Sequence, residues 1–123
     1  MKLHPDASNA FATQSYGSDG VVVNGQLKAL PLILCAVQGP KTWSANSFDT
    51  LTQANFDELL PYEPELVIFG SGSRIKFPAP RLLQGLIHKG IGVDTMDNGA
   101  ACRTFNVLAG EGRRVLMVLL PLA

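Results

Sequence analysis

Apolar residues along this chain fall into short runs and helical stripes that glycine, proline and asparagine separate. The continuous run "ELVIFG" at residues 65–70 predicts a strand covered on both faces. The runs "IGVDTM" at 91–96 and "RRVLMVLLP" at 113–121 predict two further strands. Apolar stripes at 79–90 and 98–110 predict helices between them. This order predicts a right-handed parallel βαβ unit with helices covering the sheet.

The first half of the chain predicts a hairpin, a buried strand and a loop. Asn24–Gly25 separates two strand-like runs in "VVVNGQLKAL", the strongest short-range signal for a hairpin. "LPLILCAV" follows as a strand, and Pro31 places it at a sheet edge or marks its start. "GPKTWSANS" at 39–47 is expected to be a loop. Residues 1–14 are polar and aperiodic and are expected to form a flexible tail before a single α/β domain at 15–123.

Polar residues before each apolar stripe indicate where the helices start. The spacing at 49–61 predicts a helix with Asp49 or Thr52 as its N-cap. Asp97 or Asn98 is expected to cap the last helix. The helix expected at 79–90 should have one buried apolar stripe, formed by Leu82, Leu83, Leu86 and Ile87.

Composition and charge narrow the function classes. Of 123 residues, 46% are hydrophobic and 16% charged, and Lys+Arg equals Asp+Glu at 10 each. Net charge zero disfavours nucleic-acid binding, because a protein that binds phosphates normally has an excess of basic residues. With no net charge, electrostatic repulsion between copies of the chain is weak, so a weak homo-oligomer is expected. There is no signal peptide or membrane-length apolar segment, and the two cysteines form no C-x-x-C pair, which together predict a cytoplasmic protein that is not membrane-inserted.

A glycine pair follows the first central strand in "GSGSR". A dinucleotide fingerprint would need a third glycine where Ile75 stands, and the next helix starts too late, so the glycines are expected to turn the chain. Ligands of open α/β sheets nevertheless favour the crevice beyond the carboxyl ends of parallel strands. Asp94 and Asp97 would repel an anion there, and Arg103 is expected to pair with one of them. The candidate ligand-binding residues of that crevice are Gly70, Ser71, Gly72, Ser73, Arg74, Asp97, Asn98 and Arg103.

Catalytic and metal-binding groups are sparse. Cys102 lies near a helix start beside Arg103, which would lower a thiol pKa, but neither His4 nor His88 is placed to act as its base. Cys102 is therefore predicted to pack in the core, as is Cys35. We identify no catalytic constellation and no clustered ligands for a metal, and no cofactor is expected.

Two aromatic residues stand on segments that the pattern leaves as loops. Trp43 is the sole tryptophan, and core packing is favoured for it because Trp is highly buried on average. The alternative is an interface anchor, a role in which Trp is enriched. Phe77 follows the glycine turn. Together Trp43 and Phe77 are the candidate partner-binding residues.

Several of these motifs in combination resemble one family. They are the strand ending in G-x-G, the "KGIGVDTMD" strand, the "ACRTFNVL" helix and "EGRRVLMVLLP", over roughly residues 15–121. The chain resembles the small α/β domain-of-unknown-function family that includes the mitochondrial NADH dehydrogenase (complex I) assembly factor three and the adipogenesis-associated cytosolic protein. The resemblance implies a three-layer α/β fold with a central mixed sheet flanked by helices, whose last strand runs antiparallel to its neighbours. It also implies that no enzymatic activity is established for the family and that the mitochondrial member acts through protein partners.

Two hypotheses follow. The first is a non-enzymatic protein-interaction domain, an assembly or accessory factor for a membrane complex. Because the chain lacks the mitochondrial extension, a bacterial cytoplasmic setting is expected. The alternative is a small-molecule or anion-binding domain, or an enzyme of unidentified type, that uses the loops after strands 66–70 and 91–95.

Overall fold

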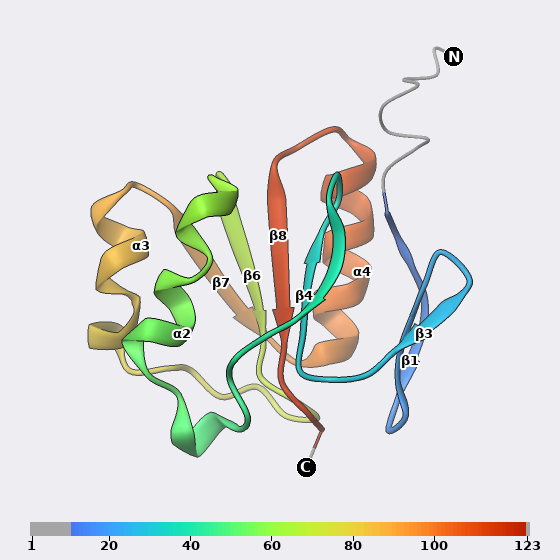
Figure 1. Ribbon diagram of the computed structural model, residues 1–123, viewed down its shortest axis with the longest axis horizontal. Coiled ribbons are helices and arrows are strands. Elements are labelled where there is room, and N and C mark those ends of the chain that lie inside the picture. Colours follow the sequence, from blue (N-terminus) through green and yellow to red (C-terminus); the bar gives the residue numbers. More distant parts are fainter. Residues whose placement is uncertain (1–10, 123) are drawn as a thin grey trace.

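The computed structural model describes residues 11–122 as one α/β unit (Figure 1). Residues 1–10 of the expected tail lie outside the described part of the chain. The elements follow one another as β1 (Thr13–Gly17), β2 (Gly20–Val23), β3 (Gln26–Lys28), β4 (Leu32–Cys35), β5 (Gly39–Thr42), η1 (Phe48–Thr50), α2 (Gln53–Asp57), η2 (Leu60–Tyr62), β6 (Leu66–Gly70), η3 (Pro80–Leu83), α3 (Gln84–His88), β7 (Gly92–Met96), α4 (Asn98–Gly110) and β8 (Val115–Leu119).

The central sheet has five strands in the order β5-β4-β8-β6-β7. Strand β6 pairs in parallel with both β7 and β8, whereas β4 pairs antiparallel with both β5 and β8. The predicted parallel βαβ unit and the mixed three-layer fold are confirmed. The expectation that the last strand runs antiparallel to all its neighbours is wrong, because β8 is antiparallel only to β4.

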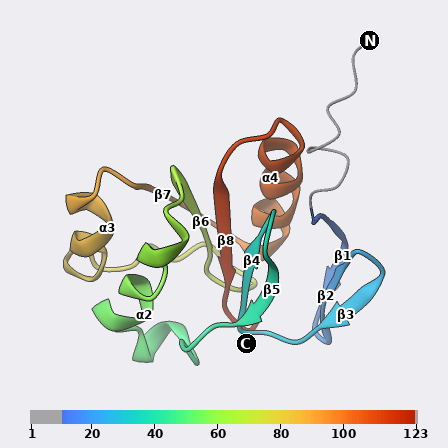
Figure 2. The ribbon, with the colours of Figure 1, turned by 45° about the horizontal axis from the view of Figure 1, so that its top comes forward.

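Alternating side chains of the central strands divide the interior into two cores. One face packs with α4 and the small sheet, and the other packs with α2, η3 and α3, which lie on the opposite side (Figure 2). Along β8, for example, Met117 faces α4 while Leu116 and Val118 face the other core. Because both faces are covered, every residue of β8 is buried, which explains its continuous apolar run.

A separate three-stranded antiparallel sheet, in the order β1-β2-β3, lies beside α4 (Figure 1). The predicted hairpin joins β2 to β3, with φ of 47° at Asn24 and 83° at Gly25, as its turn requires. Strand β1 was not predicted. It begins at Thr13, inside the range 1–14 expected to be tail, and Thr13 is itself buried.

Three local expectations need correction. Residues 39–47, which were expected to form a loop, contain the edge strand β5. Pro40 has no backbone N–H to donate, and an edge strand tolerates proline because one of its sides has no neighbouring strand. The helix expected at 49–61 is only α2, capped by Thr52 through a capping box with Asn55, between two 3-10 turns. On α3, Ile87 is exposed rather than part of the buried stripe.

Candidate functional site

The loops after β6 and β7 meet, as the parallel pairing of these strands requires, and Asn98 holds them together. The backbone N–H of Gly72 donates to Asn98 Oδ1 at 3.0 Å, and the N–H of Asn98 donates to the Gly72 carbonyl at 2.9 Å. Asn98 Nδ2 donates to the Leu120 carbonyl at 2.8 Å. These three bonds join the ends of β6 and β8 to the first residue of α4. Asn98 is buried and acts as a structural clamp.

The serines of the crevice are also bonded within the chain. Ser71 Oγ donates to the Arg74 carbonyl at 2.6 Å and accepts from the N–H of Lys76 at 2.9 Å. Ser73 Oγ donates to the Leu122 carbonyl at 3.0 Å. The hydroxyls therefore shape this loop, and ligand binding by it stays a prediction.

The two glycines serve the turn in different ways. Gly72 has a φ of 111°, which side chains rarely adopt, and an added Cβ would lie 3.0 Å from the Pro121 carbonyl oxygen. Gly70 is enclosed, and an added Cβ would collide with Leu119 and Asn98. The expectation that the glycines turn the chain is confirmed at Gly72, whose backbone conformation is costly for other residues.

Arg103 does not join the crevice. Its Nη1 donates to the Tyr16 hydroxyl at 2.9 Å, which links α4 to β1 on an exposed surface. The predicted ion pair with Asp94 or Asp97 is therefore wrong. Asp97 instead caps α4, where its Oδ1 accepts from the N–H of Ala100 at 2.9 Å. The N-cap prediction is confirmed.

Cys102 lies in the core between α4 and the small sheet, with 2% of its surface exposed. Burial raises its pKa from the ordinary 9.0 to about 11, although a hydrogen bond with Thr13 and the charge of Arg103 act in the opposite direction. A nucleophilic thiol needs a lowered pKa and access to solvent. The structural role predicted for Cys102 fits this environment, whereas Cys35 is only partly buried.

Trp43 belongs to the other core and is 1% exposed. Its ring packs edge-on against Phe56 at 5.6 Å and Phe69 at 6.1 Å between centroids. Its Nε1 donates to the Asn55 carbonyl at 2.9 Å, so the buried polar atom is satisfied. The favoured core-packing interpretation of Trp43 is correct, and the alternative of an interface anchor does not fit its burial.

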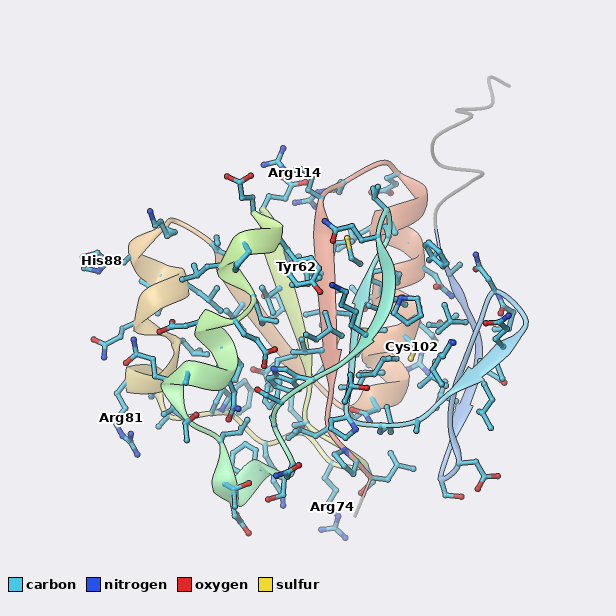
Figure 3. The ribbon with its side chains drawn as sticks, viewed as in Figure 1. Tyr62, Arg74, Arg81, His88, Cys102 and Arg114 are labelled. Atoms are coloured by element: carbon cyan, nitrogen blue, oxygen red, sulfur yellow. The ribbon has the colours of Figure 1, made fainter. Side chains whose placement is uncertain are left out.

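Ser73–Phe77, which we call the exposed loop, is a run of exposed residues between β6 and α3 that includes two large apolar side chains. All five residues are exposed, with Phe77 at 71% and Ile75 at 52%. Arg74 points away from the body of the molecule (Figure 3), and Lys76 Nζ lies 5.6 Å from the ring centroid of Phe48. Within residues 11–122, neither cation forms an ion pair with a carboxylate.

The sequence analysis identified Arg74 and Phe77 but missed Ile75 and Lys76. The available signal was the alternation of cations and large apolar residues in "RIKF", between a glycine turn and Pro78. Pro78 is buried and anchors the far end of the loop. A shallow hollow of about 370 Å³ lies against the exposed loop and includes Phe48 and residues 120–122.

Clusters of metal ligands and membrane-spanning helices are both absent from the part of the chain that the structure describes. From residue 11 to residue 122, no cluster of three His, Cys, Asp or Glu residues could hold a metal ion. No helix in the same range is long and apolar enough to cross a membrane.

The fold is a small α/β domain, and the exposed loop lies between its strand β6 and its helix α3. The family "Protein of unknown function (DUF498/DUF598)" matches residues 13–120, and the chain belongs to this family. The resemblance noted from the sequence is confirmed.

Individual relatives carry a more specific name. The chain is 34% identical to the bovine and 32% identical to the human "NADH dehydrogenase [ubiquinone] 1 alpha subcomplex assembly factor 3". Each alignment covers 97% of this chain but only 65% of the relative's length. A solved structure from Bordetella parapertussis superposes with a TM-score of 0.85 at 28% identity, covering 91% of this chain and 96% of that one.

Proposed function

We propose that this chain is a non-enzymatic accessory factor that assists the assembly of a membrane complex by binding a protein partner. Relatives of the family are named assembly factors for NADH dehydrogenase, and they support this class of function. The partner-binding surface in this proposal is the exposed loop.

The observation that carries the proposal is the exposure of Phe77. A large aromatic side chain that is 71% exposed has apolar area available for burial, and aromatic residues are enriched at protein interfaces. Ile75 adds a second apolar side chain on the same short segment. Burial of such area contributes about 25 cal/mol per Å² before the costs of association. The same side chains support weak self-association in isolation.

The exposed loop is also tied to the rest of the chain by side-chain hydrogen bonds. The Ser71 hydroxyl bridges Arg74 and Lys76, while Ser73 is bonded to Leu122. A loop that is already ordered loses less conformational entropy on binding. Arg74 and Lys76, which lack ion-pair partners in the described range, favour a partner surface that carries carboxylates.

The proposal is tested by affinity capture from native cells with wild-type protein and Phe77→Ser. Ile87→Ser is the matched control, because Ile87 is similarly exposed at 57% but lies on α3. We expect Phe77→Ser to lose a partner that both wild type and Ile87→Ser retain, with all three proteins equally folded. If Phe77→Ser retains every partner, the exposed loop is not the binding surface.

A further inference from the structure

A second hollow lies at the end of the sheet opposite the exposed loop. It opens where β4 ends, β8 begins and α4 terminates, and the segment after η2 forms its remaining side. Figure 3 shows Tyr62 and Arg114 toward this end and Arg74 at the other. The volume is about 640 Å³, and residues from all four of these segments line it.

The lining is apolar except at its rim. Ala36 and Ala109 are buried in the core on the α4 side of the sheet and Leu116 in the core on the other side, so apolar residues line the hollow on both sides of the sheet end. Val37 stands at the edge and is 86% exposed, the most exposed large apolar side chain in residues 11–122. The half-buried ring of Tyr62 adds an aromatic surface, and burial, ahead of the Cys35 and Glu58 charges, raises its pKa, so the hydroxyl stays a neutral donor.

The charged residues of the lining are Arg113 and Arg114, and the Glu65 carboxylate, which is not part of the lining, forms an ion pair with Arg113. Arg113 Nε donates a hydrogen bond to Glu65 Oε1 at 3.3 Å, and Arg114 Nε donates one to the Glu63 carbonyl at 3.3 Å. Both side chains are thus anchored through Nε, while their terminal nitrogens donate to no acceptor within residues 11–122. Guanidinium groups bind carboxylates through such paired terminal donors.

The size and shape fit a small molecule better than a protein. Small-molecule sites have volumes of about 300–1,000 Å³ and apolar walls with a few polar groups, whereas protein interfaces bury about 800 Å² per partner on flatter surfaces. We propose that this hollow binds an amphipathic carboxylate of the fatty-acid class, with its chain along Val37, Tyr62 and Leu116 and its carboxylate at Arg113 and Arg114. This site is separate from the exposed loop and does not depend on the proposed function.

Cys35 provides a direct readout of occupancy. It lines the hollow and is partly exposed, whereas Cys102 is buried, and the chain has no other cysteine. The probe is dodecanoate below its micelle concentration, and the readout is the rate of Cys35 alkylation by iodoacetamide, followed by peptide mass spectrometry. We expect dodecanoate to slow this alkylation saturably. Dodecanol, which has the same chain without the charge, is expected to bind about tenfold more weakly.

Two variants test the two parts of the assignment. Val37→Asp places a repelling charge at the apolar edge and is expected to abolish protection, while Leu27→Asp, an exposed control on β3, is expected to retain it. The double variant Arg113→Gln, Arg114→Gln is expected to weaken dodecanoate about tenfold, to the level of dodecanol. Unchanged alkylation with dodecanoate, equal protection in Val37→Asp, or equal binding of acid and alcohol would overturn the proposal.

Discussion

Asn98 and Gly72 exchange two hydrogen bonds, one through the Asn98 side chain at 3.0 Å and one through its backbone at 2.9 Å. The pair lies where two parallel strands end and α4 begins. In open α/β folds this position commonly binds ligands. Here the Asn98 amide bonds the protein's own backbone, which leaves the adjacent exposed loop in a fixed position.

Asn98→Ala removes the partners of the Gly72 N–H and the Leu120 carbonyl. Each buried polar group left unpaired costs about 1–3 kcal/mol, so we expect the free energy of unfolding to fall by about 3 kcal/mol. Urea denaturation measures this change. The exposed Asn46 provides the control, and Asn46→Ala should change stability by less than about 0.5 kcal/mol. Equal effects of the two substitutions would show that the clamp contributes little.

Gly72→Ala introduces a Cβ at a φ of 111° and close to the Pro121 carbonyl oxygen. We expect a loss of about 1–3 kcal/mol in the free energy of unfolding. Gly110→Ala is the contrasting change, because Gly110 is in α4 with open space around it, and Ala favours a helix by up to about 1 kcal/mol. The midpoint temperature of thermal unfolding should therefore fall for Gly72→Ala and not for Gly110→Ala. A stable Gly72→Ala protein would contradict the strained turn.

Arg103→Ala should have a small effect, because the bond from Arg103 to Tyr16 lies on the surface. We expect a loss of less than about 1 kcal/mol in the free energy of unfolding. A double-mutant cycle with Tyr16→Phe should give a coupling of about 0.5 kcal/mol. A loss of several kcal/mol would indicate a buried ion pair instead.

The raised pKa of Cys102 predicts a loss of stability in alkaline solution. The unfolded thiol ionises near 9.0, while the folded one stays protonated up to about 11, so the unfolded state binds fewer protons between these values. The stability that the protonated Cys102 thiol contributes to the folded state is fully present below pH 9 and is lost as the pH rises through 11. Relative to Cys102→Ala, wild type should lose roughly 2 kcal/mol over this window. Parallel pH profiles of the two proteins would exclude the effect.

Strands β6 and β8 of the central sheet were predictable because burial on both faces leaves an unbroken apolar run in each of them. The turn at Asn24–Gly25 was predictable because its backbone angles demand those residues. Strands β1 and β5 were not, since both are mostly polar and each pairs with the neighbouring strand in the sequence across a short turn that the apolar pattern does not mark.

The candidate site was only partly predictable. The sequence places Asn98 and Gly72 at neighbouring strand ends, but it does not reveal that their polar groups bond each other. The same limit applies to Arg103, whose partner Tyr16 is on a strand that the pattern missed. The burial of Trp43 depends on packing with Phe56 and Phe69, which only the tertiary structure brings together.

The central claim is that the exposed loop contacts a protein partner, and cross-linking in living cells tests it most directly. A photoreactive phenylalanine analogue replaces Phe77 in one protein and Ile87, the exposed α3 residue, in another. We expect illumination to yield a discrete cross-linked protein from position 77, identifiable by mass spectrometry, and none of it from position 87. No cross-link from position 77, or the same products from both positions, would contradict the account.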